Sequence, residues 1–133
     1  MVDNKIVGKI DKGLVLLVGF KVDDKIEDID YLVKKVINLR IFDDENGVMN
    51  KSILDVGGKI LSISQFTLYA DTKKGNRPSY NISMKNEEAK KYYDLFNEKL
   101  REYIEVETGI FRADMKVNII NDGPVTIMLE SRS

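Results

Sequence analysis

Apolar residues recur along this chain with two different periods, which divide it into strands and helices. The run at residues 14–20 is apolar at successive positions, as in an interior strand covered on both faces. Residues 59–64 alternate between apolar and polar, as a strand with one buried face does. Between these strands, apolar residues at three- and four-residue spacing predict a helix over residues 25–38.

Weaker patterns complete the element order. Residues 5–10 alternate imperfectly and are followed by a turn signal at 11–13, so a β-hairpin with residues 14–20 is expected. A second helix is expected over residues 86–103, where an aromatic stripe at helical spacing is typical of core packing. Shorter strands are expected at 39–42, 106–113, 116–121 and 125–130. These patterns predict one mixed α/β domain spanning residues 1–133.

The composition removes several kinds of chemistry. The chain contains no cysteine and no histidine. Disulfides, thiol nucleophiles, a Ser-His-Asp triad and a His-ligated zinc ion are therefore excluded. Catalysis by this chain would have to use hydroxyls, carboxylates, Lys, Tyr, backbone groups or the substrate itself.

Charge and hydropathy limit the possible partners. The 21 basic and 22 acidic residues give a net charge of −1, which argues against strong sequence-blind binding of nucleic acid over the whole surface. No apolar run is long enough to span a membrane, and residues 1–20 lack the pattern of a secretory signal. The expected compartment is the cytoplasm.

Two stretches carry candidate chemistry. Residues 64–71 place hydroxyls and an amide beside aromatic rings at the end of a strand, which suits a polar substrate but also fits a plain strand running into a loop. Residues 72–85 lack periodicity and contain Lys73, Lys74 and Arg77. This loop indicates a phosphate partner or merely a solvated surface, and both interpretations stay open. The acidic turn at 43–47 lacks the spacing of a calcium loop.

Two longer motifs resemble those of a known family. Ser64-Gln65-Phe66-Thr67-Leu68-Tyr69-Ala70-Asp71 with the following Thr72, and the later Asn121-Asp122-Gly123-Pro124-Val125-Thr126, are similar to the signature motifs of D-aminoacyl-tRNA deacylase, formerly called D-tyrosyl-tRNA deacylase. Stretches at 39–42, 49–50, 54–58, 77–79 and 106–109 also match in order and spacing. The resemblance therefore covers nearly the whole chain.

The resemblance implies mixed β-sheets in two layers with two helices on one side. It also implies hydrolysis of the ester that joins a D-amino acid, or glycine mischarged on tRNA-Ala, to the end of tRNA, with rejection of L-aminoacyl-tRNA. The implied site lies at a homodimer interface, where a cis Gly123-Pro124 peptide from one subunit enters the pocket of the other. Without the resemblance, a trans peptide bond in a turn is the default expectation for Gly-Pro, because most X-Pro bonds in folded proteins are trans. Aminoacylated tRNA is the implied partner, and no DNA, membrane or cofactor is expected.

Within this implied site, Ser64, Gln65, Phe66 and Thr67 are the candidate catalytic residues. Backbone amides near Gln65 and Phe66, with the Ser64 hydroxyl or the Gln65 amide, are candidates for contacting the developing oxyanion. Thr67 is expected to position the substrate, because a hydroxyl without an adjacent base is a poor nucleophile; the ribose 2′-hydroxyl would then assist. The implied substrate-binding residues are Met115, Asn121, Val125, Thr126, Lys73, Lys74 and Arg77.

One departure and one alternative accompany the resemblance. Family members begin with an extra strand before the segment equivalent to Val2-Asp3-Asn4, and that strand is expected to be missing here. An uncovered neighbouring strand edge would be a liability. The alternative function is a non-catalytic homodimeric module that binds RNA or nucleotides and has lost turnover.

Overall fold

The computed structural model describes residues 1–131. It is built around a parallel three-stranded sheet in the order β1-β4-β5, formed by β1 (Gly13–Val18), β4 (Lys59–Ser64) and β5 (Val106–Thr108). Residues Ile60 to Ile63 of β4 are all buried, so this strand lies at the centre of the sheet. The expected strand at 59–64 is confirmed.

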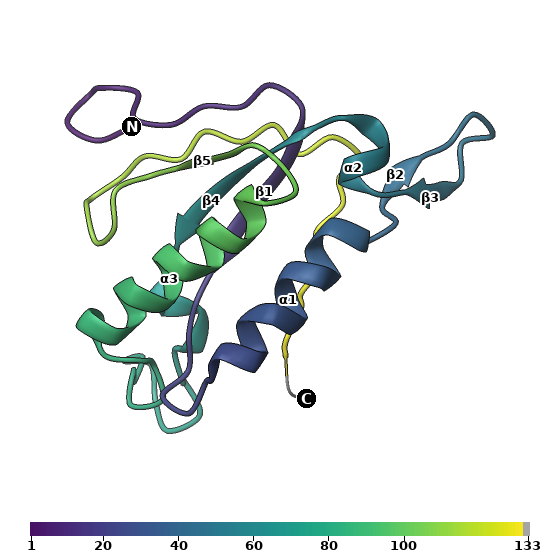
Figure 1. Ribbon diagram of the computed structural model, residues 1–133. Coiled ribbons are helices and arrows are strands. Elements are labelled where there is room, and N and C mark those ends of the chain that lie inside the picture. Colours follow the sequence, from purple (N-terminus) through teal and green to yellow (C-terminus); the bar gives the residue numbers. More distant parts are fainter. Residues whose placement is uncertain (132–133) are drawn as a thin grey trace.

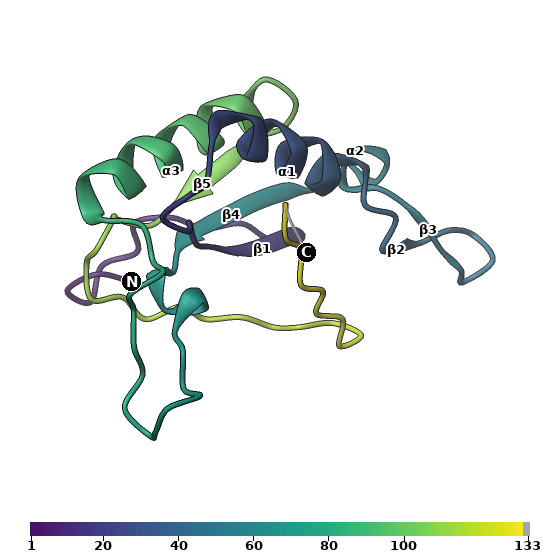
Figure 2. The same cartoon turned by 90° about the horizontal axis from the view of Figure 1, so that it is seen from below.

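Two long helices cover one face of this sheet (Figures 1 and 2). Helix α1 (Ile26–Asn38) buries Ile29, Val33, Val36 and Ile37, and α3 (Asn86–Arg101) buries Tyr93, Phe96, Asn97 and Leu100. Both helices are confirmed within two residues of the predicted bounds. The mixed α/β fold with helices on one side of the sheet is confirmed as well.

A shorter helix was missed by the sequence reasoning. Helix α2 (Ile53–Val56) begins after Ser52, whose hydroxyl accepts a hydrogen bond from the Asp55 amide at 3.2 Å, while Asp55 accepts one from the Ser52 amide at 2.9 Å. Gly57 ends the helix in the left-handed conformation with φ of 66°. This capping box and the closing glycine were readable in the sequence. The structure thus has three α-helices among its described residues, not two.

The predicted hairpin between residues 5–10 and β1 is wrong. No strand is assigned to residues 5–10, and β1 pairs in parallel with β4 instead. The N-terminal segment lies against β5, where a Cβ atom added to Gly8 would come within 2.4 Å of the Thr108 carbonyl oxygen. Strand β1 is at the edge of the sheet rather than inside it, and Leu17 is 47% exposed.

A second, antiparallel pair is formed by β2 (Phe42–Asp43) and β3 (Met49–Lys51). The Asp44 carboxylate closes the turn between them by accepting the amides of Asn46 and Val48, at 2.8 and 3.1 Å. The reversal expected from the 43–47 turn is confirmed. The strand predicted over 39–42 is shorter and later than expected, because only Phe42 of that range belongs to it.

The C-terminal segment differs most from the prediction. The strand expected over 106–113 ends at Thr108, and neither 116–121 nor 125–130 is assigned as a strand. These residues run in extended form past the sheet (Figure 2). Their alternating apolar pattern is a strand pattern, but regular strands also need a hydrogen-bonding neighbour along their length. In the part of the chain described here, that neighbour is absent.

Candidate active site

The first motif begins where β4 ends. Ser64 is the last residue of β4, and Phe66–Tyr69 then form η1, a single 3₁₀ turn, rather than an irregular loop. The Gln65 amide donates to the Val18 carbonyl of β1 at 2.7 Å, so the sheet itself fixes the start of the motif. Gly19 permits this approach, because a Cβ there would lie 2.9 Å from the Gln65 carbonyl oxygen.

The functional groups of this motif face solvent. Phe66 is 50% exposed, and Thr67 is also exposed. The Gln65 side-chain amide donates to the Thr67 hydroxyl oxygen at 2.5 Å. At the beginning of η1, the amides of Phe66 and Thr67 have no hydrogen-bond partner among the described residues. Two amide donors and one hydroxyl are therefore presented together at the end of the sheet.

The basic loop is an extension of this motif. Asp71 and Ser79 exchange backbone hydrogen bonds of 2.8 Å in both directions and close the loop. Lys73, Lys74 and Arg77 are all exposed on it. The loop projects from the same end of the molecule as η1 (Figure 2).

The second motif is a turn held by one side chain. The Asn121 oxygen accepts from the Val125 amide at 3.0 Å, and the Asn121 nitrogen donates to the Thr126 hydroxyl at 2.9 Å. The Gly123–Pro124 peptide bond enclosed by these contacts is cis, as the resemblance implies. All residues from 121 to 126 are exposed.

The two motifs do not meet within one chain. The first follows the C-terminal end of β4, whereas the segment around residues 121–126 turns on the side of the sheet away from the helices, toward the opposite end of that strand (Figures 1 and 2). A strand of six residues is about 20 Å long. Met115, a further expected substrate-binding residue, lies closer to the first motif's end of the sheet, because its sulfur lies against Gly109, after β5.

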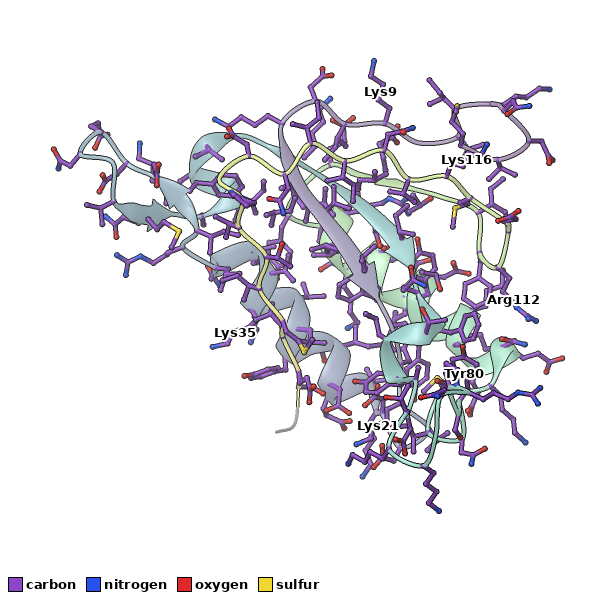
Figure 3. The ribbon with its side chains drawn as sticks, turned by 180° about the vertical axis from the view of Figure 1, so that it is seen from behind. Lys9, Lys21, Lys35, Tyr80, Arg112 and Lys116 are labelled. Atoms are coloured by element: carbon purple, nitrogen blue, oxygen red, sulfur yellow. The ribbon has the colours of Figure 1, made fainter. Side chains whose placement is uncertain are left out.

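Four residues that were not predicted as site residues lie near the first motif. A small hollow of about 40 Å³ is lined by Ser64 and Phe66 together with Gly19, Phe111 and Arg112. Arg112 has a left-handed backbone with φ of 63°, and Figure 3 shows it at the same end of the molecule as Tyr80 and Lys21. Tyr80 packs edge-on to Phe66, with ring centroids 5.2 Å apart. No sequence signal separated Arg112 from any other surface cation.

Neither a metal site nor a membrane span adds to this picture. In residues 1–131, no group of three or more acidic, cysteine or histidine side chains is placed to hold a metal ion. None of the helices there is long and apolar enough to cross a bilayer. The chemistry offered is that of amides, hydroxyls and exposed cations.

Comparison with known proteins identifies the family. The family model described as "D-Tyr-tRNA(Tyr) deacylase" matches residues 1–130. The chain belongs to the D-Tyr-tRNA(Tyr) deacylase family. The matched range contains both motifs that resemble the signature motifs of this family.

Solved structures share the fold of this chain. One, described as "c-Myc DNA Unwinding Element Binding Protein", superposes with a TM-score of 0.95 at 39% identity, and the match covers 100% of this chain and 91% of that one. Another, described as "Structural Analysis of a probable eukaryotic D-amino acid tRNA deacylase", has a TM-score of 0.65 at 18% identity over 77% of this chain and 61% of that one. At 18% identity, the likeness to the second structure concerns the fold alone.

Proposed function

We propose that this protein hydrolyses the ester bond of D-aminoacyl-tRNA, and of glycine mischarged on tRNA-Ala, and rejects L-aminoacyl-tRNA. The observation that carries the proposal is the exposed group formed by the Thr67 hydroxyl and the Phe66 and Thr67 amides, in a chain of the deacylase family. On this proposal the protein acts in the cytoplasm on charged tRNA.

The amides of Phe66 and Thr67 stabilise the oxyanion. Water adds to the ester carbonyl carbon, the carbonyl oxygen becomes negatively charged, and two N–H donors favour that charge. The backbone amide of Gln65 does not serve in this role because it donates to the Val18 carbonyl. The C–O bond to the ribose then breaks, and the leaving ribose oxygen takes up a proton. An aminoacyl ester is already activated, so positioning it beside water supplies much of the acceleration.

Thr67 positions the substrate rather than attacking it. Its oxygen accepts a hydrogen bond from the side-chain amide of Gln65, which is not a base, so nothing there withdraws the hydroxyl proton. That proton is available to donate to the substrate. The neighbouring ribose 2′-hydroxyl relays the proton between water and the leaving oxygen.

The second wall of the pocket comes from another copy of the chain. The separation of the two motifs within one chain supports an arrangement in which Gly123-Pro124 of one subunit faces Ser64 to Thr67 of the other. Backbone carbonyls at Gly123-Pro124 leave room for a hydrogen atom or a D side chain and exclude an L side chain. Asn121, Val125 and Thr126 hold this wall in shape.

Exposed cations bind the tRNA backbone. Lys73, Lys74 and Arg77 lie on the loop that follows η1, and Arg112 lies beside Ser64 and Phe66. Phosphate groups near the aminoacylated end would be held from this side. Such binding weakens as salt concentration rises.

The decisive experiment compares D-Tyr-tRNA with L-Tyr-tRNA as substrates of the purified protein. The D-ester is expected to be hydrolysed at least about 100-fold faster, a difference of roughly 2.7 kcal/mol in transition-state stabilisation. Equal rates for the two esters would refute chiral selection. No hydrolysis of either, with tRNA still bound, would favour the alternative of a binding module without turnover.

A Thr67→Ala variant separates the two roles of that hydroxyl. Loss of a positioning contact is expected to slow hydrolysis of D-Tyr-tRNA by about 10- to 100-fold. A loss of several orders of magnitude, with substrate binding retained, would make Thr67 the nucleophile. Ser83→Ala is the matched control, since Ser83 loses only an exposed bond from its hydroxyl to the Phe66 carbonyl.

The name of the structure that is 39% identical to this chain raises DNA binding as a second candidate. The net charge of −1 disfavours sequence-blind binding to DNA here. Competition between DNA and uncharged tRNA for the protein, at one fixed salt concentration, distinguishes the two. We expect tRNA to compete at least tenfold better.

A further inference from the structure

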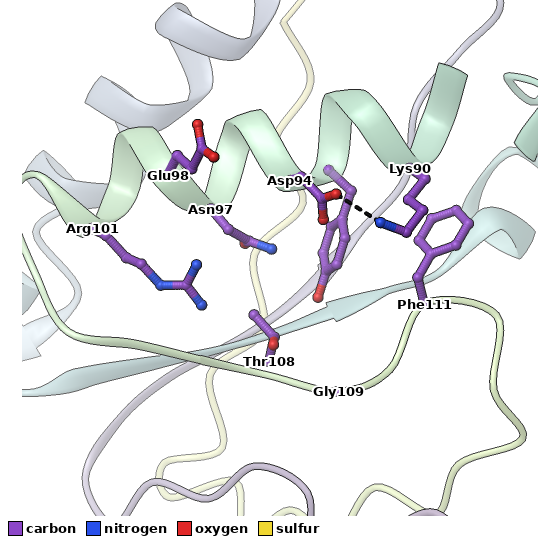
Figure 4. Close-up of a pocket in the computed structure, with 9 residues that line it drawn as sticks. Lys90, Asp94, Asn97, Glu98, Arg101, Thr108, Gly109 and Phe111 are labelled. Atoms are coloured by element: carbon purple, nitrogen blue, oxygen red, sulfur yellow. Dashed lines mark hydrogen bonds and ion pairs between the residues drawn. The ribbon is translucent and has the colours of Figure 1, made fainter. Parts of the chain in front are cut away.

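A larger cavity lies away from the candidate active site, between α3 and the end of β5 (Figure 4). Its volume is about 280 Å³, close to the lower limit of small-molecule sites. Tyr93, Asn97 and Arg101 line it from α3, and Thr108 and Phe111 line it from the opposite side. None of the catalytic candidates from Ser64 to Thr67 borders it.

Asn97 places a buried amide group beside this cavity. The residue is only 2% exposed, and its side chain extends from α3 toward the cavity (Figure 4). Its Oδ1 atom is buried and has no hydrogen-bond partner among residues 1–131. The Nδ2 atom, a hydrogen-bond donor, stands at the open tip of the side chain (Figure 4).

A second unpaired polar group lies at the same interface. Ser62 is fully buried, and its hydroxyl oxygen has no hydrogen-bond partner within the described part of the chain. It is the register neighbour of Thr108, so the two side chains share one face of the sheet. The Tyr93 hydroxyl donates to the Ser62 carbonyl at 2.7 Å and so ties α3 to this part of β4. The polar groups of Asn97, Ser62 and Thr108 therefore gather under one helix.

Charges of opposite sign lie on either side of Asn97 along α3. Arg101 is four residues later, so their Cβ atoms are about 5–6 Å apart. Its guanidinium makes one long contact of 3.4 Å with the Val106 carbonyl and has further N–H donors directed toward the cavity (Figure 4). Asp94, three residues earlier, pairs with Lys90 at 2.9 Å, with both side chains more than half exposed. An exposed pair of this kind is weak and can exchange partners.

We propose that this cavity is a second binding site, for a free α-amino acid in its zwitterionic form. The carboxylate accepts hydrogen bonds from Arg101 and from Asn97 Nδ2, and the ammonium group pairs with the Asp94 carboxylate, which also lines the cavity. The side chain packs against Tyr93 and Phe111, whose ring centroids are 5.9 Å apart. A ligand whose two charges are separated by one carbon atom matches an amide donor and a carboxylate on adjacent helical turns. The proposal does not require the protein to be a hydrolase.

The test is an NMR titration of the isotope-labelled folded protein with D- and L-phenylalanine. Phenethylamine and 3-phenylpropionate serve as probes that lack one of the two charges. Saturable shifts are expected at residues 94–101 and 108–111, with the single-charge probes at least tenfold weaker. If either single-charge probe bound as tightly as phenylalanine, the proposal would be overturned. It would also be overturned if no shifts appeared at these residues up to about 10 mM phenylalanine, because the cavity would then hold water alone.

Variants separate this site from the candidate active site. Arg101→Gln is expected to weaken phenylalanine binding at least tenfold. The matched control is Lys91→Gln, which removes an exposed cation on the same helix that does not border the cavity. Thr108→Val provides a second variant if Arg101→Gln fails to fold. Binding that survives these cavity changes but is lost in Thr67→Ala would assign the amino acid to the active site and refute a second site.

Discussion

The two motifs differ in what holds them. The first is attached to the sheet: Gln65 is hydrogen-bonded to β1, and the residues just before the motif are buried in β4. The second is an exposed turn closed mainly by the side chain of Asn121. Reactive groups need accurate placement, which a packed core supplies. A surface that enters another subunit must instead protrude, and local hydrogen bonds are sufficient to shape it.

The largest expected effect comes from removing the core beneath the first motif. Ile60 is 0% exposed and Ile120 is 98% exposed. Ile60→Ala is expected to lower the free energy of unfolding by about 2–5 kcal/mol, because it leaves a cavity. Ile120→Ala should change the free energy of unfolding of a single, unassociated chain by less than about 0.5 kcal/mol. Urea denaturation checks both, and a large cost at Ile120 would show that this surface is covered by a second copy.

Adding a side chain at Gly19, where the first motif contacts the sheet, should displace that motif without leaving a cavity in the core. In Gly19→Ala, the new Cβ would lie 2.9 Å from the Gln65 carbonyl oxygen and 3.2 Å from the Leu68 Cβ. We expect a loss of about 1–3 kcal/mol in stability and at least tenfold in kcat/KM for D-Tyr-tRNA. Native activity in this variant would mean that the 3₁₀ turn does not need its position on the sheet.

Tyr93 gives the core beneath the first motif a pH dependence. Burial raises the pKa of the Tyr93 phenol above its ordinary value of 10.0. Below about pH 10 the phenol is neutral in both states, and its stabilisation is complete. As pH rises further, the unfolded chain releases the proton first, so stability falls up to the pKa of the folded state.

A Tyr93→Phe variant isolates this contribution. It should cost about 1–2 kcal/mol at neutral pH, because the Ser62 carbonyl loses a buried donor. The decline in stability above pH 10 should become shallower than in the wild type. Thermal unfolding between pH 7 and about 11 measures both effects. Unchanged slopes would show that the phenol titrates alike in the folded and unfolded chains.

The smallest effect on stability is expected at the second motif. Asn121→Ala removes two exposed hydrogen bonds and should cost less than about 1 kcal/mol. Asn38→Ala is a matched control, since it removes an exposed side-chain bond to the Lys34 carbonyl in α1. Only Asn121→Ala should reduce the preference for D-Tyr-tRNA over L-Tyr-tRNA, by about tenfold. Equal preference in both variants would remove the turn from chiral selection.

Local patterns predicted the helices well. The apolar stripe of α1 and the aromatic stripe of α3 each follow from side-chain spacing on one segment, and both helices formed within two residues of their expected bounds. The capping box of α2 was equally local and could have been recognised. Strand pairing was harder, because the pattern of residues 5–10 permits a hairpin but cannot show that Gly8 lies against Thr108.

The sequence by itself determined the residue types available, the absence of histidine and cysteine, and both motifs of the candidate site. The tertiary structure decided which groups are free to act: it engages the Gln65 amide with Val18, leaves those of Phe66 and Thr67 open, and brings Arg112 beside Ser64. It also separates the two motifs and buries Asn97 beside an open cavity. These outcomes depend on contacts between segments distant in sequence, which local spacing does not encode.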